Sequence, residues 1–333
     1  MSKVVFIAGM HRSGTSMVAR LLHHCGIYLG SENDLKVPQP DNLEGYWENA
    51  QFRLLNDEIL SELNGGWDFT PKVDSGWEKS YKFLNIRSEA SELIKQFSSH
   101  DQWGWKDPRN SLTFPFWNEL IPLMKVVICV RSPLEVANSL LKRNYLSPAL
   151  AFNLWLEYNQ KILSHSEPEN RIITHYDSYF RDPYMELTRV LKFLEMEIPE
   201  KHIMKVVEMV DVGLHHNQST IVDLLVEAPA QVINLYQEMC NQTEEVFQLL
   251  PDTDIEFRTH FDKYLQSDDT DKDIKLLSIK LQNAKKIINE REQRIQILTS
   301  QLDTRERELS EIYRSKAWHF IQMVRRTRQR IFG

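Results

Sequence analysis

A glycine-rich stretch near the amino terminus combines residue types that bind anions. Gly9 and Gly14 stand five residues apart in the segment GMHRSGTS, which also holds Arg12, Thr15 and Ser16. Glycines let the backbone curl so that successive N–H groups face inward, and a helix that begins there adds partial positive charge. The stretch therefore predicts a cradle for a phosphate group.

The spacing of this stretch is that of a Walker A phosphate loop with one change. Where that motif has a lysine that reaches the terminal phosphates, this chain has Thr15, and its cation is Arg12, inside the loop. A γ-phosphoryl donor with bound Mg²⁺ is therefore disfavoured. The alternative is an ordinary strand-turn-helix corner, but the glycines, the arginine and the hydroxyl groups together exceed what a turn requires.

Cations and a hydroxyl group also follow a second apolar run. Lys125–Val130 has the composition of a buried strand, and Arg131 comes directly after it. On the helix expected next, Ser139 and Arg143 are four residues apart and so share one face. This arrangement predicts a second anion site at a distance from the loop. A solvated helix face beside a strand-end arginine is the alternative.

The elements that would position these residues alternate along the chain. An apolar strand precedes Gly9, a short strand within Gln102–Arg109 is broken by Pro108 and leaves Lys106 at its carboxyl end, and Arg171–His175 is a further short strand. Helical patterns cover 17–24 and 50–63 and begin near Pro133, Pro148 and Pro183. Strands that alternate with helices predict a three-layer, P-loop-like α/β fold with a central parallel sheet.

Composition limits the class of protein. The 333 residues are 42% hydrophobic, which is enough for a sizeable core. No apolar run approaches the roughly 18 residues of a membrane span, and the first strand begins too early to leave room for a signal peptide. The three cysteines have no metal-ligand spacing. These features predict a cytoplasmic protein without a metal site.

The last part of the chain differs in charge and in periodicity. Residues 272–333 hold 15 Lys+Arg against 7 Asp+Glu, whereas the preceding residues hold 25 against 40. That acidic balance argues against nucleic-acid binding by the main domain. Apolar residues recur every seven positions at Ile274, Leu281, Ile288, Ile295, Leu302 and Leu309. We therefore expect a domain over 1–265 and a coiled-coil helix over 272–313 that self-associates, with a single helix folded back on the domain as the alternative.

Residues 314–333 mix aromatic and aliphatic side chains with arginines and contain no acidic residue. This composition is typical of a basic amphipathic helix that lies on a membrane surface, which would place the protein at the inner membrane face. A basic tail that binds a protein partner is the alternative.

Four motifs in this order resemble those of the sulfotransferase family, which transfers sulfuryl from 3′-phosphoadenosine-5′-phosphosulfate (PAPS). GMHRSGTS resembles its 5′-phosphosulfate loop, and VVICVRSPLEVANSLLKR resembles its 3′-phosphate motif. WKDPR is similar to the Lys-Asp-Pro stretch of the tyrosylprotein branch, and ITHYDSYFRDP resembles a Tyr-Glu-Asp-Leu stretch, with Tyr176 at the Tyr. The resemblance covers residues 4 to about 195. Gly213–Thr220 is the candidate to replace the Arg-Lys-Gly loop that closes over the nucleotide in cytosolic members.

The resemblance implies that PAPS is the donor and assigns residues to it. The residues on matching positions are His11, Arg12, Ser13, Gly14, Thr15, Ser16, Arg131, Ser139 and Arg143. Lys106 falls on the lysine that stabilises the transition state. Positioning and electrostatics carry most of such group transfers, so Arg12, the loop amides and Lys106 can neutralise the leaving oxygen without a metal.

The catalytic base has several candidates, because a carboxylate or an imidazole can take the proton of an acceptor hydroxyl. Glu48 in GYWEN matches a pattern of bacterial members of the family. Glu32 stands at nearly the distance after the loop at which tyrosylprotein sulfotransferases keep their glutamate. His11 and Asp107 are further candidates.

Together these features predict a PAPS-dependent sulfotransferase acting on a hydroxyl of a glycan or glycolipid, because a membrane-seeking tail would place the enzyme where such polymers are assembled. The aromatic residues of Gly65–Trp77 could form a wall for a sugar acceptor, or they could pin a long loop to the core. Two other classes are a P-loop nucleotide or sugar kinase, and a coiled-coil scaffold with a vestigial nucleotide site.

Overall fold

The computed structural model describes residues 2–31, 33–35, 45–211, 213, 219, 221–243, 299–300 and 307. The chain divides into two units, Met1–Ser267 and Asp268–Gly333. Of the second unit only Thr299, Ser300 and Arg307 are described, so the expected coiled coil and basic tail lie almost wholly outside the described residues. Both stay predictions, as do the domain bounds.

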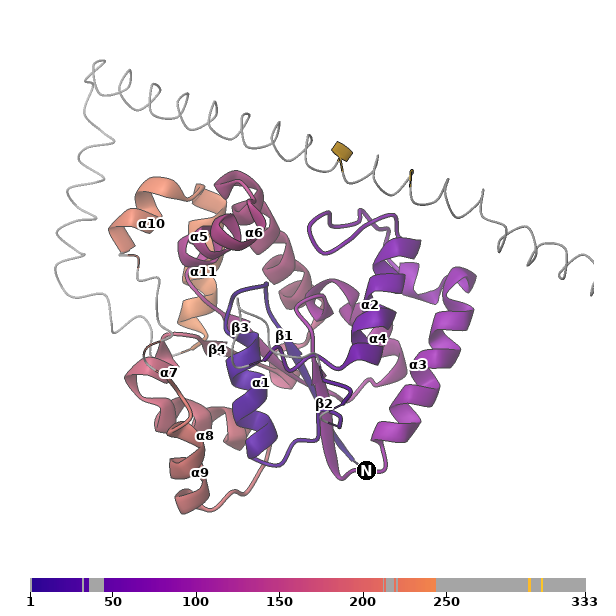
Figure 1. Ribbon diagram of the computed structural model, residues 1–333, viewed down its shortest axis with the longest axis horizontal. Coiled ribbons are helices and arrows are strands. Elements are labelled where there is room, and N and C mark those ends of the chain that lie inside the picture. The colour runs from indigo at the N-terminus through magenta and orange to yellow at the C-terminus, as the bar shows by residue number, and fades with distance from the viewer. Residues whose placement is uncertain are drawn as a thin grey trace, which may run out of the picture. The chain divides into compact units, whose positions relative to one another are not determined.

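The strands form one sheet, and helices separate them along the chain (Figure 1). The strands are β1 (Lys3–Ala8), β2 (Gln102–Lys106), β3 (Lys125–Val130) and β4 (Arg171–His175). The helices are α1 (Thr15–His24), α2 (Ala50–Glu62), α3 (Leu84–Phe97), α4 (Asn110–Leu120), α5 (Pro133–Asn144), α6 (Pro148–His165), α7 (Ser178–Arg181), α8 (Pro183–Phe193), α9 (Glu200–Val207), α10 (Ile221–Glu227) and α11 (Ala230–Asn241). Short 3₁₀ helices cover Trp77–Lys79, Tyr81–Phe83 and Pro168–Asn170.

In the described part of the chain the sheet has the order β2-β1-β3-β4, and every neighbouring pair is parallel. Strand β1 is central, with Ile7 opposite Lys106 on one side and Val127 on the other. The predicted α/β fold with a parallel sheet is confirmed. Strand β2 ends at Lys106, earlier than the predicted Gln102–Arg109, because a turn begins there in which Asn110 N–H donates to Asp107 O.

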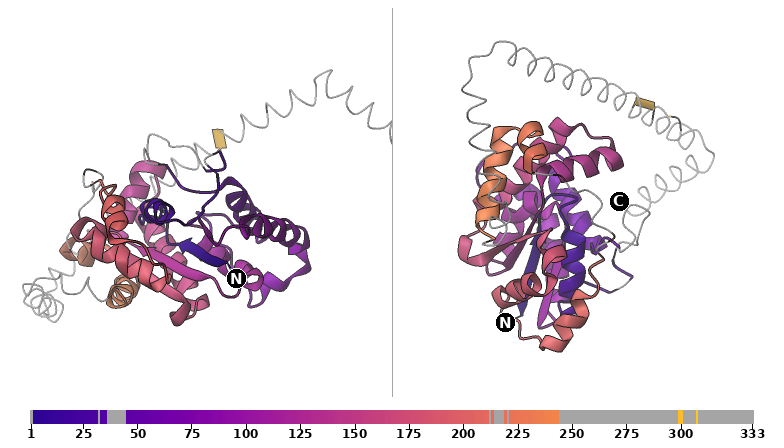
Figure 2. Two further views of the ribbon diagram at one scale, coloured as in Figure 1. Left: turned by 90° about the horizontal axis from the view of Figure 1, so that it is seen from below. Right: turned by 90° about the vertical axis from the view of Figure 1, so that its left-hand side faces the viewer.

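Helices cover both faces of the sheet (Figure 2). Val4, Phe6 and Ala8 of β1 point into one buried cluster with α2 to α6 and α11, while Val5 and Ile7 point into the other with α1, α8 and α9. Both sets are buried, which explains why the strand is a continuous apolar run in the sequence and does not alternate with polar residues. This is the three-layer arrangement that the sequence predicts.

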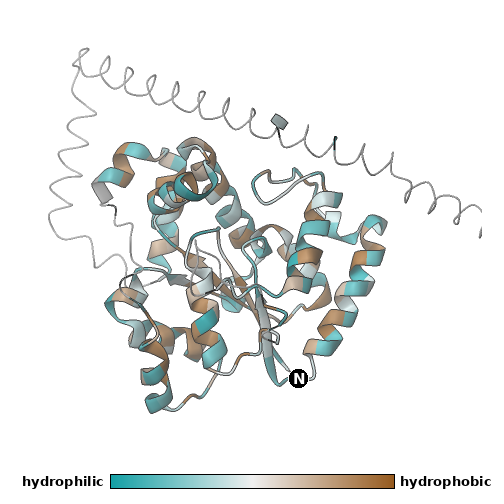
Figure 3. Ribbon diagram, viewed as in Figure 1, coloured by the Kyte–Doolittle hydropathy of each residue, from teal (hydrophilic) through white to brown (hydrophobic). Residues whose placement is uncertain are grey.

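Amphipathic patterns determine which face of each helix is buried, and local sequence signals mark where the helices begin. Helix α3 buries Ile86, Ala90, Leu93 and Phe97, and Figure 3 shows it striped with hydrophobic and hydrophilic residues. Helices α5, α6 and α8 begin at the predicted prolines, where the missing N–H is not needed. Ser132 precedes α5 at the N-cap position, but its hydroxyl makes no capping bond and instead lies 3.3 Å from Ser219 Oγ.

The strand order reverses between β1 and β3. The chain leaves β1 toward β2 on one side, and it leaves β3 toward β4 on the other. Ligands of open α/β sheets bind where neighbouring connections diverge in this way. The glycine-rich loop follows β1 and Arg131 follows β3, so the topology brings the two predicted anion sites to one edge of the sheet.

A buried histidine at the same edge makes the stability of the fold depend on pH. His175 is 1% exposed; its Nδ1 accepts from Asp177 N–H at 3.2 Å, so we assign the proton to Nε2, which donates to Tyr236 Oη at 2.9 Å. Burial lowers the pKa of His175 from its ordinary value of 6.5, and Asp177 and Glu186 oppose that shift only in part. The folded protein therefore holds the neutral ring.

We expect the free energy of unfolding to fall as the pH drops below 6.5, because the unfolded chain then takes up a proton that the folded chain does not. The slope from this one group is at most about 1.4 kcal/mol per pH unit. Urea unfolding at a series of pH values should show a shallower slope for His175→Gln than for wild type. An unchanged slope in the variant would contradict this assignment.

Candidate active site

The loop after β1 has the backbone of an anion cradle. Gly9 and Gly14 have φ of +134° and +85°, and a Cβ at Gly9 would lie 2.4 Å from Cys129 O of β3. Gly14 precedes α1 in the left-handed region, and among the described residues no side chain caps that helix. Ser13 Oγ is buried without a hydrogen-bond partner in the described residues. A helix that starts at a glycine without a capping side chain, together with this buried hydroxyl, fits a bound phosphate group.

Arg12 ties this loop to the two neighbouring elements. It has a φ of +70°, which is uncommon for a residue with a side chain and marks local strain. Its Nε donates to Ser139 Oγ at 2.8 Å, and its carbonyl oxygen accepts from Arg131 Nη1 at 3.4 Å. Three of the residues assigned to the nucleotide are therefore in direct contact.

Lys106 and Glu48 form a buried ion pair beside the loop. Lys106 is 2% exposed, and its Nζ donates to Glu48 Oε1 at 2.8 Å. The same ammonium donates to Tyr46 O at 3.0 Å and to Ser16 Oγ at 3.2 Å. Because Ser16 belongs to the first turn of α1, the pair lies at the edge of the anion cradle. This places a general base candidate next to the candidate for charge stabilisation.

Arg131, after β3, is held between an acid and an aromatic ring. Its Nε donates to Glu135 Oε2 at 2.8 Å, and its guanidinium lies 4.2 Å from the centroid of the Tyr176 ring. Glu135 Oε1 also accepts from Ser219 N–H at 3.0 Å. The predicted closing segment Gly213–Thr220 thus reaches this site at Ser219; its residues 214–218 and 220 lie outside the described residues.

Arg143 contacts the other half of the site. Its Nη2 donates to Tyr46 Oη at 3.1 Å, and its guanidinium lies 5.5 Å from the Tyr46 ring centroid. The Tyr46 carbonyl oxygen also accepts a hydrogen bond from Lys106, so Tyr46 joins α5 to Lys106. Sequence reasoning missed Tyr46 as a site residue, although it stands two residues before Glu48 in GYWEN. Glu135, also missed, could have been found as a carboxylate four residues after Arg131.

Asp107 is engaged on both carboxylate oxygens. Oδ1 accepts from the backbone N–H and from Nη1 of Arg109, each at 2.9 Å, and Oδ2 accepts from Asn56 Nδ2 at 3.1 Å. Complete burial raises the pKa of Asp107 against the influence of Arg109, and the nearby Glu48 carboxylate raises it further. These contacts favour a structural role for Asp107 over that of a base.

The remaining base candidates differ in what the structure says of them. The His11 ring packs against two aromatic rings, with centroids 4.7 Å from Trp67 and 5.9 Å from Tyr158. Glu32 lies outside the described residues. Within the described chain, Glu48 is the candidate that is paired with Lys106.

Among the described residues, no group of three or more His, Cys, Asp or Glu side chains is placed to hold a metal ion. Among the same residues no helix has both the length and the hydropathy to cross a membrane.

Comparison with known proteins gives the family. The model of the family described as "Sulfotransferase family" matches residues 4–200, which is more than half of the chain. The chain therefore belongs to the sulfotransferase family, and the class of chemistry predicted from the sequence is confirmed.

Individual relatives are distant. A putative protein-tyrosine sulfotransferase of Caenorhabditis briggsae is 22% identical over 211 residues, 60% of this chain and 68% of the relative. The sulfotransferase domain of the Synechococcus PCC 7002 olefin synthase is 17% identical with a TM-score of 0.42, over 72% of this chain and 96% of that domain. Mouse sulfotransferase SULT7A1, solved with PAP, is 11% identical with a TM-score of 0.38, over 73% of this chain and 85% of its own.

Proposed function

We propose that this protein transfers a sulfuryl group from PAPS to a hydroxyl group of a glycan or glycolipid. The observation that carries the proposal is the meeting of the glycine-rich loop before α1, the Lys106–Glu48 pair and Arg131 at one edge of the sheet. A donor with a 5′-phosphosulfate and a separate 3′-phosphate needs two anion sites on either side of a nucleoside. The loop and the Arg131–Ser139 region supply such a pair.

The chain's residues divide the binding of the donor between them. Backbone N–H groups at the start of α1 and the Ser13 hydroxyl would hold the 5′ end, and Arg131 with Ser139 would hold the 3′-phosphate. Arg12 already contacts Ser139, so it would bridge the two ends. When bound, PAPS supplies the sulfuryl group, and 3′,5′-bisphosphoadenosine (PAP) leaves.

Lys106 and Glu48 would act on the reacting atoms. Lys106 would exchange its Glu48 partner for the oxygen between phosphorus and sulfur, where negative charge builds as that S–O bond breaks. Glu48, released from the pair, would accept the proton of the acceptor hydroxyl while the oxygen of that hydroxyl forms the new bond to sulfur. The proton, the sulfuryl group and the leaving oxygen are thus each assigned.

Calorimetry with nucleotides tests the donor. We expect PAP to bind about ten- to a hundredfold more tightly than 5′-AMP without Mg²⁺, because the 3′-phosphate gains charge-assisted hydrogen bonds at Arg131. Ser139→Ala should weaken PAP binding and leave 5′-AMP binding unchanged. A preference for ATP with Mg²⁺ would overturn the proposal and favour a kinase.

A further inference from the structure

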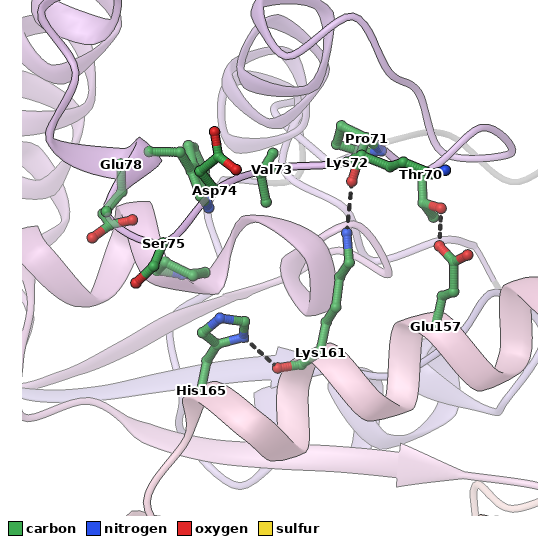
Figure 4. A pocket seen from close by; sticks show the side chains of 13 residues that line it. Thr70, Pro71, Lys72, Val73, Asp74, Ser75, Glu78, Glu157, Lys161 and His165 are labelled. Carbon is green, nitrogen blue, oxygen red and sulfur yellow. Dashed lines mark hydrogen bonds between the residues drawn. The ribbon is translucent and has the colours of Figure 1, made fainter.

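A cavity of about 560 Å³ opens between the loop 70–78 and helix α6 (Figure 4). Its size falls within the range of sites that bind small molecules. Its walls carry charged groups of both signs, namely Lys72, Asp74, Glu78, Glu157, Lys161 and His165, beside the indole of Trp77. None of these residues belongs to the site described above.

Lys161 is a half-buried ammonium in the cavity wall. The hydrogen bond that the structure gives this ammonium in the described chain goes to Pro71 O at 2.9 Å. An ammonium can donate three hydrogen bonds, so two remain for water or a ligand. Burial lowers the pKa of Lys161, and the nearby Glu157 carboxylate opposes that shift only in part.

Hydrogen-bond acceptors line the same wall of α6. Glu157 accepts from Thr70 and, at 3.2 Å, from Asn153 Nδ2, and as a carboxylate it has further lone pairs. His165 Nδ1 lies 2.7 Å from Lys161 O, and since a carbonyl only accepts, Nδ1 is the donor and Nε2 is left as an acceptor in the neutral ring. Figure 4 shows Glu157, Lys161 and His165 projecting from successive turns of α6 toward the loop.

These groups select one class of ligand. Three carboxylates against two lysines argue against a simple anion, and a half-buried ammonium argues against a purely apolar ligand. Hydroxyl groups both donate and accept, so a sugar can satisfy Lys161 and Glu157 together while an apolar ring face packs on Trp77. Saccharide is therefore the chemistry that matches all three features.

The cavity is connected to the active site through one loop. The Trp67 ring packs against His11 of the anion loop, and Trp67 O accepts from Tyr158 Oη at 2.6 Å. Thr70, where the cavity begins, is three residues further, a span of at most about 11 Å. Tyr158 is also next to Glu157 on α6. A chain of sugar units that leaves the reaction centre past Trp67 would thus enter the cavity.

We propose that the cavity between 70–78 and α6 is an acceptor subsite that binds saccharide units adjacent to the one that is sulfated. The subsite rests on the proposed function, since it requires a carbohydrate acceptor. It gives the aromatic loop Gly65–Trp77 a defined task, with Trp67 at the active-site end and Trp77 at the far end.

Kinetics of Lys161→Met in the full-length protein test the subsite, because methionine keeps most of the stem and removes the ammonium. The probes are neutral gluco-, galacto- and N-acetylgluco-oligosaccharides, from mono- to hexasaccharides, with PAPS as donor. We expect KM for the longer acceptors to rise about tenfold or more with kcat nearly unchanged, and KM for monosaccharides to stay the same. Lys205→Met, at an exposed position of α9 on the other face of the sheet, is the matched control and should behave as wild type.

PAP affinity, measured on the same samples, separates the two proposals. If PAP binds normally and Lys161→Met leaves every oligosaccharide KM unchanged, the subsite is wrong and the donor assignment stands. Failure of wild type to bind PAP removes the proposed function itself. Sulfation of tyrosine peptides with no activity on any saccharide would also overturn the subsite. Glu157→Gln, which keeps an oxygen for Thr70, guards against misfolding of the first variant and should likewise raise KM for the longer acceptors.

Discussion

Glutamine at position 48 is expected to slow turnover by about 10²- to 10⁴-fold, which is the range of general-base contributions. The amide keeps the shape of the side chain and an oxygen that can accept from Lys106 Nζ, now 2.8 Å from the carboxylate, but it cannot take up the acceptor's proton. Affinity for PAP should therefore stay near that of wild type. Steady-state kinetics with calorimetry on the same preparation measures both quantities.

Lys106→Ala provides the contrast, because it should lower turnover and also weaken PAPS binding. It also leaves Glu48 as a buried, unpaired charge, which typically costs about 3 to 5 kcal/mol of stability. The double variant Lys106→Ala, Glu48→Gln removes that charge and should regain stability but not turnover. If instead Glu48→Gln turns over like wild type while Glu32→Gln does not, the base is Glu32.

The main groups of the site could be predicted from the sequence because the alternation of strands and helices predicts the topology of the sheet. Carboxyl ends of parallel strands meet at one edge, so the loop after β1, Lys106 at the end of β2 and Arg131 after β3 were expected to lie together. Strand and helix starts were equally accessible, since prolines and apolar runs mark them locally. These predictions needed no knowledge of which side chains touch.

Contacts between distant segments were beyond the sequence. Tyr46 O accepts a hydrogen bond from Lys106, and Tyr46 Oη accepts one from Arg143. Both contacts depend on the course of a loop that no local sequence pattern determines. The sequence allows Asp107 as a base, and it does not show that Asn56 of α2 donates a hydrogen bond to the Asp107 Oδ2 atom. The left-handed backbone of Arg12 is a further case, because local propensity disfavours it and tertiary contacts hold it.

The sequence prediction gave only part of the reason for the glycine at position 9. We assigned it to the curl of the anion loop, and its φ of +134° agrees, but the nearest obstacle to a side chain is the backbone of β3. A Cβ there would lie 2.4 Å from Cys129 O, a backbone atom that cannot move without the sheet. Gly9 therefore also sets how closely the loop approaches β3.

Gly9→Ala is accordingly expected to lower the free energy of unfolding by about 2 to 6 kcal/mol, combining about 1 to 3 for the backbone conformation with about 1 to 3 for overpacking. Because the loop must move away from β3 to relieve the contact, PAP affinity should fall as well. Urea unfolding and calorimetry measure the two effects. Gly66→Ala is the matched control: a Cβ at Gly66 meets only Asp68 Oδ1, at 3.8 Å, so its stability should stay within about 1 kcal/mol of wild type. Equal stability of the two variants would show that Cys129 O does not constrain the loop. If Gly9→Ala is destabilised but keeps its PAP affinity, the glycine is required for stability and not for the anion cradle.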